Sequence, residues 1–242
     1  MKYNIYNKTQ NKYYTLSMVE IIQMIKKYPN DVFFKIIGHK IYKIHNPFIL
    51  NTTFICHRIN QLQSLQNISN IFGVEIDIRD GLKVAHDPDE WGVHLNDYLL
   101  KYNHEIIIFN IKCERMEMEC LKLIKKYNIK NYFFLDSNLP MIVYLNNYCD
   151  NQNIAARFSE FEPIEYFEKI KDLVSWVWVD CFNEFPLTTE TYKKLSEKKI
   201  CIVSPELHNK KENIQSYREI LINSNIVPNA ICCKYDNIIE WI

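Results

Sequence analysis

The run Phe72-Gly73-Val74-Glu75-Ile76-Asp77-Ile78 is short, rich in apolar residues and interrupted by two carboxylates. Apolar runs of this length are typical of strands that are buried on both faces, as in a parallel sheet. Side chains alternate between the two faces of a strand, so Glu75 and Asp77 share one face while Val74 and Ile76 share the other. The run therefore predicts a strand of a parallel sheet with both carboxylates directed to the same side.

Seven similar runs surround this one, and segments with helical spacing separate them. Strands alternating with helices predict an α/β protein, here a (β/α)8 TIM barrel over residues 53–242. An open doubly wound sheet is the alternative, but eight strands in about 190 residues favour closure because an open sheet leaves two exposed edges. Asn60, Ser137 and Thr188 are expected N-caps. The other strands are expected at 53–58, 105–111, 131–135, 154–158, 174–181, 199–203 and 230–234, with helices near 95–102, 115–127, 140–150, 163–172, 188–198 and 213–224.

Residues 1–52 do not follow the strand–helix alternation. Ser17 and Glu20 have the spacing of a capping box, which predicts a helix over about 17–28. Two apolar runs, 32–37 and 40–44, flank Gly38-His39 and predict a hairpin. We therefore expect a small N-terminal α+β extension, and its sequence carries no functional signal.

Charge, hydropathy and cysteine content limit which binding partners and which cellular location are expected. Basic and acidic residues number 29 each, so no large electrostatic footprint for nucleic acid is expected. No apolar run approaches the roughly 20 residues of a transmembrane helix, and the N-terminus lacks the apolar core of a signal peptide. The eight cysteines include no Cys-x-x-Cys pair. Four of them lie in apolar, strand-like runs, Cys56, Cys181, Cys201 and Cys232, and we expect reduced, structural thiols in a cytoplasmic protein.

The carboxylate pair is the first candidate site. In a TIM barrel the catalytic groups lie at the C-terminal ends of the strands, where Glu75 and Asp77 would face the barrel mouth. Two carboxylates so close repel each other unless a cation neutralises them, and oxygen ligands suit Mg²⁺ or Ca²⁺. The alternative is a salt-bridged pair with Arg58, Arg79 or Lys112, and spacing alone leaves both open.

Two histidines lie on either side of this pair in the sequence. His57 follows the first strand, and His86 follows a short hairpin through Gly81. Two imidazoles beside a metal suit phosphodiester hydrolysis, because one takes a proton from the attacking oxygen and the other gives a proton to the leaving oxygen. Either histidine alone is better explained by packing or a loop position, but the combination with the acidic pair favours catalysis.

Three motifs in this order resemble the signature of the glycerophosphodiester phosphodiesterase superfamily: His57-Arg58, then Gly73-Val74-Glu75-Ile76-Asp77-Ile78-Arg79, then Val84-Ala85-His86-Asp87-Pro88. The resemblance covers residues 54–88 and is fainter over 105–112. It implies a metal-dependent phosphodiesterase on a TIM barrel, acting on a small-molecule phosphodiester such as a glycerophosphodiester or a glycan- or nucleotide-linked one, in some cases through a cyclic phosphate. The roles it implies are an acid–base pair of His57 and His86, metal ligands Glu75 and Asp77, and charge stabilisation by Arg58 and Lys112.

The chain departs from the family pattern at three places. Ile59-Asn60 directly follows the His-Arg pair, where the family usually has Gly followed later by Glu-Asn. The third acidic ligand falls on Asn110, whose amide can still bind Mg²⁺ or Ca²⁺ but with one negative charge fewer. The insertion that many members carry after the second histidine is missing. Because of Asn110, a second hypothesis remains: a barrel that binds a phosphate ester without turning it over.

Four further residues at strand ends are candidates for substrate binding, although Trp178 is better explained by core packing: Arg157, Trp178, Glu206 and Lys234. A metal-dependent aldolase or isomerase is a third reading, with Lys112 or Lys234 as the Schiff-base nucleophile. The His-Arg and His-Asp-Pro motifs favour the phosphodiesterase.

Overall fold

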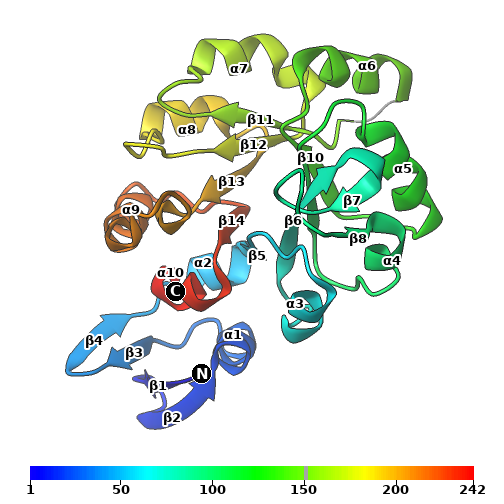
Figure 1. The fold of residues 1–242 in the computed structure, drawn as a ribbon. Helices are drawn as coiled ribbons and strands as arrows, with labels where there is room; N and C mark the ends of the chain where they lie inside the picture. The colour runs from blue at the N-terminus through cyan, green and yellow to red at the C-terminus, as the bar shows by residue number, and fades with distance from the viewer. Residues whose placement is uncertain (150–151) are drawn as a thin grey trace.

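Two β-sheets organise the chain in the computed structural model, which describes residues 1–149 and 152–242 (Figure 1). The larger sheet has the strand order β10-β9-β6-β5-β14-β13-β12-β11, and the short strands β7 (Lys83–Val84) and β8 (Val93–His94) extend from β6 as antiparallel neighbours. The smaller sheet is antiparallel and formed by the N-terminal residues. The chain therefore has the mixed α/β class that the sequence predicted, with a central parallel sheet.

All eight predicted strands are present, and each pairs in parallel with its neighbours in the strand order. Their β-branched and aromatic side chains are buried on both faces, which is why the runs lack a polar side. The strands are β5 (Thr53–Cys56), β6 (Gly73–Arg79), β9 (Ile107–Ile111), β10 (Tyr132–Leu135), β11 (Ala155–Phe158), β12 (Trp176–Val179), β13 (Lys199–Val203) and β14 (Ala230–Cys233).

The two ends of this strand order approach each other. Phe134 of β10 forms a parallel bridge with Ile154, the residue before β11. The amide of Phe134 donates a hydrogen bond of 2.8 Å to the carbonyl oxygen of Asn153. The first and last strands of the order therefore lie side by side at this point.

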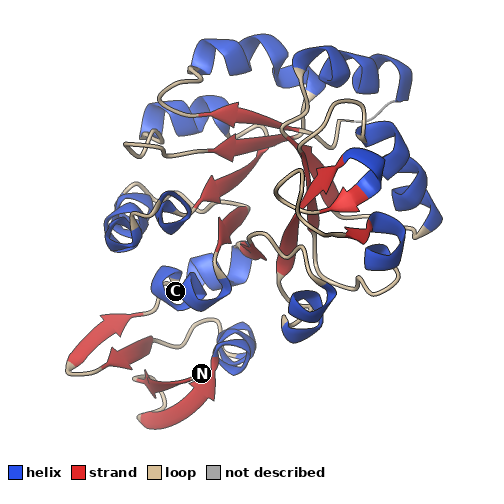
Figure 2. Cartoon of the chain, viewed as in Figure 1, coloured by secondary structure: helices blue, strands red, loops and turns tan. Residues whose placement is uncertain are grey.

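Helices follow the strands and lie around the outside of the parallel sheet (Figure 2). Thr188 caps its helix as predicted, but Asn138 takes the place of Ser137, because the Asn138 side chain accepts from the amide of Met141 at 2.9 Å. The predicted helix 140–150 is present, although residue 150 lies outside the described residues. The helices are α3 (Leu62–Asn67), α4 (Leu95–Leu99), α5 (Glu117–Lys126), α6 (Leu139–Cys149), α7 (Ile164–Ile170), α8 (Thr189–Leu195), α9 (Ile214–Asn223) and α10 (Ile238–Trp241).

Five 3₁₀ turns connect these elements. The first separates β6 from β7, and the others follow α7, β13 and β14 or precede α9. They are η1 (Asp80–Leu82), η2 (Lys171–Leu173), η3 (Pro205–His208), η4 (Lys211–Asn213) and η5 (Tyr235–Asn237).

The N-terminal region contains the predicted helix and hairpin and, in addition, a strand pair that the sequence did not reveal. Ser17 and Glu20 form the expected capping box. The strands β1 and β2 alternate mainly asparagine, tyrosine and lysine, and only Ile5 and Asn7 are fully buried, so the apolar strand signal is weak. The elements are β1 (Lys2–Asn7), β2 (Lys12–Ser17), α1 (Met18–Lys27), β3 (Phe33–Ile37), β4 (Lys40–Lys43) and α2 (Asn46–Asn51).

Two buried cations connect the N-terminal sheet, α9 and the last helix. The ammonium of Lys35 on β3 donates to the carbonyl oxygen of Ile239. The guanidinium of Arg218 on α9 donates to the carbonyl oxygens of Lys43 at 3.0 Å and Trp241 at 2.9 Å. Cations at the carbonyl end of a helix satisfy acceptors that lack an intrahelical partner.

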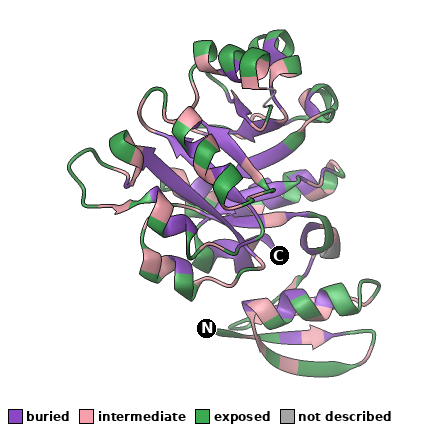
Figure 3. Cartoon of the chain, turned by 90° about the vertical axis from the view of Figure 1, so that its right-hand side faces the viewer, coloured by how far each residue is buried: buried purple, intermediate pink, exposed green. Residues whose placement is uncertain are grey.

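Buried residues concentrate in the strands of the parallel sheet, whereas the loops, the outer helix faces and the N-terminal sheet carry exposed residues (Figure 3). The four cysteines expected to pack within strands (Cys56, Cys181, Cys201 and Cys232) are all buried, and all eight cysteines are free thiols. None of the helices among residues 1–149 and 152–242 is long and apolar enough to cross a bilayer.

Candidate active site

Two carboxylates lie within the buried parallel sheet. Glu75 and Asp77 are both fully buried, on the same face of β6, while Val74 and Ile76 fill the opposite face. Asp77 is in register with Asn110 of the neighbouring strand β9. Buried carboxylates are costly without a partner, so their contacts show what the site can hold.

Glu75 is held by two donors on neighbouring segments. Its Oε2 accepts from the backbone amide of Arg58 at 2.7 Å, and its Oε1 accepts from the side-chain amide of Asn110 at 2.8 Å. Arg58 has a left-handed backbone (φ 53°), which is uncommon for a residue other than glycine, and its amide points at the carboxylate. The loop after β5 is therefore shaped to bind Glu75.

Asp77 is clamped by Asn60 and faces two cations. The Asn60 side chain donates to Asp77 Oδ2 at 2.9 Å and accepts from the Asp77 amide at 2.9 Å. Lys112 Nζ lies 3.5 Å from Asp77 Oδ1, and Arg58 Nε lies 4.0 Å from Oδ2. Asn60 is thus not the predicted helix cap, since α3 begins after Gln61 and Asn60 supports the carboxylate instead.

Two buried oxygens at this site accept no hydrogen bond. They are Asp77 Oδ1 and Asn110 Oδ1, which belong to register partners on β6 and β9. Lys112 Nζ is within ion-pair distance of Asp77 Oδ1 but donates no hydrogen bond to it, so both oxygens lack a hydrogen-bond donor. Buried oxygens are rarely left without a partner, and oxygen atoms are the ligands that Mg²⁺ and Ca²⁺ prefer. The donor set therefore fits a divalent cation.

The pKa shifts of Glu75 and Asp77 also favour a bound cation. Burial raises the pKa of Glu75, although the bond from the Arg58 amide opposes that shift. Burial and the neighbouring Glu75 charge raise the pKa of Asp77. A bound cation would offset both effects. Within the described residues no cluster of three His, Cys, Asp or Glu side chains is arranged to hold a metal, so the third ligand of such a site would be the amide of Asn110.

His57 follows β5 at the edge of this pair. Its Nε2 lies 3.8 Å from Glu75 Oε2, and its side chain is 18% exposed. Burial, followed by the charge of Arg58, lowers the pKa of His57 to about 4. The imidazole is therefore neutral near pH 7, with a lone pair on one ring nitrogen, although the lowered pKa makes it a weaker base than an ordinary histidine.

His86 is presented by the hairpin that extends from β6. Asp87 Oδ1 lies 2.8 Å from His86 Nδ1, and Glu90 accepts from the His86 amide at 2.9 Å. The guanidinium of Arg79 at the end of β6 donates to the His86 carbonyl, with Nε at 2.8 Å. Because Nδ1 is engaged by Asp87, Nε2 is the ring nitrogen that is available to a substrate, and the ring is one-third exposed.

A chain of charged side chains extends from Lys112 across the C-terminal ends of the neighbouring strands. Lys112 Nζ lies 3.3 Å from Asp136 Oδ2, and Asp136 Oδ1 accepts from Arg157 at 2.7 and 2.9 Å. Arg157 also pairs with Asp180, whose Oδ1 lies 2.6 Å from His208 Nε2. The sequence pointed to Lys112 and Arg157 of this chain but not to His208, which lies beyond the end of β13 in the turn η3.

The remaining predicted substrate contacts have different positions. Glu206 is buried, pairs with Ser204 and accepts from the Lys234 amide at 2.9 Å, so it positions the main chain instead of lining the mouth. Trp178 is also buried, as its core-packing alternative predicted, and its indole N–H donates to Asp180 at 3.2 Å. Lys234 is exposed after β14.

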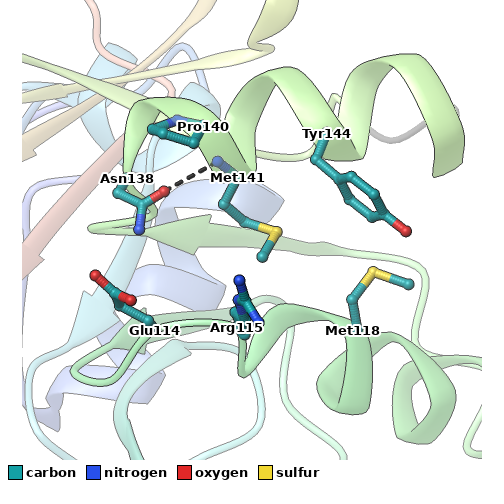
Figure 4. Close-up of a pocket in the computed structure, with 7 residues that line it drawn as sticks. All are labelled: Glu114, Arg115, Met118, Asn138, Pro140, Met141 and Tyr144. Carbon is teal, nitrogen blue, oxygen red and sulfur yellow. Dashed lines mark hydrogen bonds between the residues drawn. The ribbon is translucent and has the colours of Figure 1, made fainter.

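A cavity among the described residues contains none of the predicted site residues. It has a volume of about 540 Å³ and opens between the first turns of α5 and α6 (Figure 4). Its walls combine these turns with the loops that follow Lys112 and Asp136 in the sequence. It is lined by Glu114, Arg115, Met118, Asn138, Pro140, Met141 and Tyr144.

Comparison with known proteins identifies similar folds. Neither a protein-family model nor a curated protein sequence matches the chain. A glycerophosphoryl diester phosphodiesterase from Parabacteroides distasonis is similar over 74% of this chain and 81% of its own, with a TM-score of 0.51 and 12% identity. A glycerophosphodiester phosphodiesterase from Agrobacterium tumefaciens is similar over 78% and 97%, with a TM-score of 0.51 and 14% identity. The resemblance in the motifs is thus matched by similarity in fold.

Proposed function

We propose that this chain is a divalent-metal-dependent phosphodiesterase that cleaves a glycerophosphodiester-like or a glycan- or nucleotide-linked phosphodiester. The observation that carries the proposal is the convergence of His57, Glu75, Asp77 and Lys112 at the ends of three adjacent strands, with two buried oxygens left unpaired. The fold similarity to two phosphodiesterases supports it.

We further propose that the parallel strands close into a (β/α)8 TIM barrel. The bridge between Phe134 and Ile154 supports closure, because it joins the two strands at opposite ends of the strand order. Closure would bring the C-terminal ends of all eight strands around one mouth. The chain of charged residues from Asp77 to His208 then follows the inner rim of that mouth.

Glu75, Asp77 and Asn110 are the proposed ligands of Mg²⁺ or Ca²⁺. The unpaired Asp77 Oδ1 and Asn110 Oδ1 support this assignment, and both metals take carboxylate and amide oxygens. A cation bound there would supply charge neutralisation for the phosphoryl oxygens. Asn110 in place of a carboxylate leaves the ligand set with two negative charges, which predicts weaker binding than a three-carboxylate set would give.

The acid–base roles are assigned to the two histidines. His57, neutral because burial lowers its pKa to about 4, takes the proton from the attacking hydroxyl. His86 gives a proton from Nε2 to the leaving oxygen, with Asp87 orienting its ring through Nδ1. Arg58 and Lys112 balance negative charge on the phosphoryl oxygens. A nucleophilic hydroxyl next to the phosphate would yield a cyclic phosphate, whereas water would yield a monoester.

Two of the predicted substrate contacts remain proposals for direct binding, Arg157 and Lys234, because both lie at the C-terminal ends of parallel strands. A second function, a phosphate-ester-binding barrel without turnover, is favoured by Asn110 alone. The aldolase or isomerase reading finds no support, since Lys112 pairs with two carboxylates. Schiff-base lysines instead lie in apolar pockets or beside another cation.

³¹P NMR of the purified chain with a phosphodiester panel tests the proposal, in Mg²⁺, Ca²⁺ or EDTA. We expect a metal-dependent product resonance that is absent in His57→Ala and unchanged in His39→Ala, an exposed histidine of the N-terminal hairpin. The chemical shift would separate a cyclic product from an open one. Full turnover in EDTA or in His57→Ala would contradict the proposal, and phosphate-ester binding without any product would favour the binding barrel.

A further inference from the structure

Asp180 lies near the end of the charged chain that is farther from Glu75 and Asp77. It holds the side chains around it in place. Its side chain is 4% exposed, and it is bound by the Arg157 guanidinium, by His208 Nε2 at 2.6 Å and by the Trp178 indole N–H at 3.2 Å. A buried carboxylate with three side-chain partners fixes the orientation of each of them. Arg157 and His208 are therefore held rigidly beside it.

The groups that Asp180 holds are partly open to solvent. The side chains of Asp136, Arg157 and His208 are 24%, 26% and 25% exposed. The charged chain continues to Lys112, which is 21% exposed and lies 3.3 Å from Asp136. We call Asp136, Arg157 and His208 the distal wall. Only Lys112 lies between the distal wall and Asp77 of the proposed catalytic centre.

The charges of the distal wall select for a neutral polar ligand. Arg157 pairs with both Asp136 and Asp180, and His208 Nε2 lies 2.6 Å from Asp180 Oδ1. An apolar group would desolvate these ions without replacing their hydrogen bonds, which is unfavourable. A second phosphate would meet two carboxylates. A group with several hydroxyls can donate to Asp136 and accept from Arg157 at once, in charge-assisted hydrogen bonds.

An aromatic edge borders the same wall. The Phe182 ring centroid lies 4.9 Å from that of His208 and 5.8 Å from that of Phe161. Phe161 is 67% exposed, yet its loop is held by hydrogen bonds from the Phe161 and Glu162 amides to the Ser159 hydroxyl. An exposed ring on a fixed loop offers a preformed apolar surface. Rings and ions side by side match a pyranose, which has one apolar CH face and a rim of hydroxyls.

We propose that the distal wall is a subsite for a sugar, and that the substrate of the proposed phosphodiesterase carries a glycosyl group on its leaving side. The assignment of the leaving side rests on the proposed function, whereas sugar binding at the wall does not. Arg157 and His208 are specificity-determining residues for this group, and Phe161 supplies its stacking surface.

Binding is tested first, with the full chain and without turnover. The probes are the methyl glycosides of glucose, galactose, mannose and N-acetylglucosamine, observed by saturation-transfer NMR. We expect transfer to the ring protons of at least one glycoside in the wild type and in His57→Ala. It should fall at least fivefold in His208→Ala and in Phe161→Ala, and because Phe161 is exposed, the second variant removes no buried side chain. Lys194→Met, at a surface ion pair with Glu168, is the matched control.

Turnover supplies the second readout, as the ratio of kcat/KM for a glycerophosphohexose to that for glycerophosphoglycerol. We expect this ratio to exceed ten in the wild type and to fall at least tenfold in His208→Ala. No transfer to any of the four glycosides, or wild-type transfer in both His208→Ala and Phe161→Ala, would overturn the sugar subsite even if phosphodiester cleavage were found. Transfer that depends on the wall, without cleavage of either ester, would support the subsite and count against the phosphodiesterase.

Discussion

Asn110 Nδ2 donates to Glu75 Oε1 at 2.8 Å, while Oδ1 of the same amide is buried without a hydrogen-bond partner. The amide thus supplies a donor to Glu75, and Asn110 is also the register partner of Asp77. A carboxylate at this position would lose the donor and add a charge. In the proposed metal site, the amide therefore avoids a third negative charge at the expense of metal affinity.

Asn110→Asp should separate these two effects. Without a metal, the added carboxylate repels Glu75, whose pKa burial already raises, so the variant should unfold at a lower temperature than the wild type. With Mg²⁺ or Ca²⁺, the third charge should tighten binding about tenfold, or roughly 1.4 kcal/mol. Calorimetric titration with the metal alone measures the affinity. Asn103→Asp, an exposed residue with the same charge change, is the control, and unchanged affinity in Asn110→Asp would remove Asn110 from the ligand set.

Metal addition alone should stabilise the fold. A ligand at 100 times its Kd adds about 2.7 kcal/mol to the free energy of unfolding, which corresponds to a rise in Tm of roughly 5–10 °C for a chain of this size. Asp77→Asn should abolish the rise, because it replaces a charged ligand at the unpaired Oδ1. Asp89→Asn in the exposed loop beyond His86 should keep it. Equal shifts in both variants would place the bound metal elsewhere.

Asn60 should contribute more to the free energy of unfolding than the exposed Gln61 beside it. Asn60→Ala leaves the Asp77 amide and Oδ2 without their partners, so the free energy of unfolding should fall by about 1–3 kcal/mol. Gln61→Ala, at the exposed residue before α3, should change it far less. Urea denaturation of both variants measures the difference. A smaller loss in Asn60→Ala than in Gln61→Ala would restore Asn60 to the capping role that the sequence suggested.

The sequence predicted the position of Glu75 correctly but assigned Asn60 the wrong role. The difference shows which features follow from local pattern. Glu75 and Asp77 stand in an apolar run with period two, so the strand, its face and the paired carboxylates follow from local pattern alone. The partner of Asp77 comes from another strand–loop unit, 17 residues earlier, and an asparagine in a loop before a helix looks like a cap. His208 and the inward bonds of Glu206 likewise depend on how distant loops meet, which periodicity does not encode. The strands β1 and β2 were missed because their polar alternation buries only one apolar side chain, that of Ile5.

Lys35 gives the clearest pH dependence of stability. Burial lowers its pKa from 10.5 to about 8, followed by the nearby charge of Arg218. The folded pKa lies below the unfolded one, so between pH 8 and 10.5 the unfolded chain binds more protons at this site. The free energy of unfolding therefore gains a contribution that increases with pH across this window. The contribution is at most about 3 kcal/mol, and the carbonyl oxygens of Ile239 and Glu240 reduce it because they favour the ammonium.

Lys35→Met should remove this contribution, and the difference between the variant and the wild type isolates it from the tyrosines that titrate in the same range. We expect the stability of Lys35→Met relative to wild type to fall by about 1–3 kcal/mol between pH 8 and 10.5, measured by denaturant unfolding at several pH values. Lys40→Met, an exposed lysine on β4, should run parallel to the wild type. A constant difference for Lys35→Met would mean that the carbonyl oxygens of the last helix keep the ammonium charged throughout, and that burial does not govern its titration.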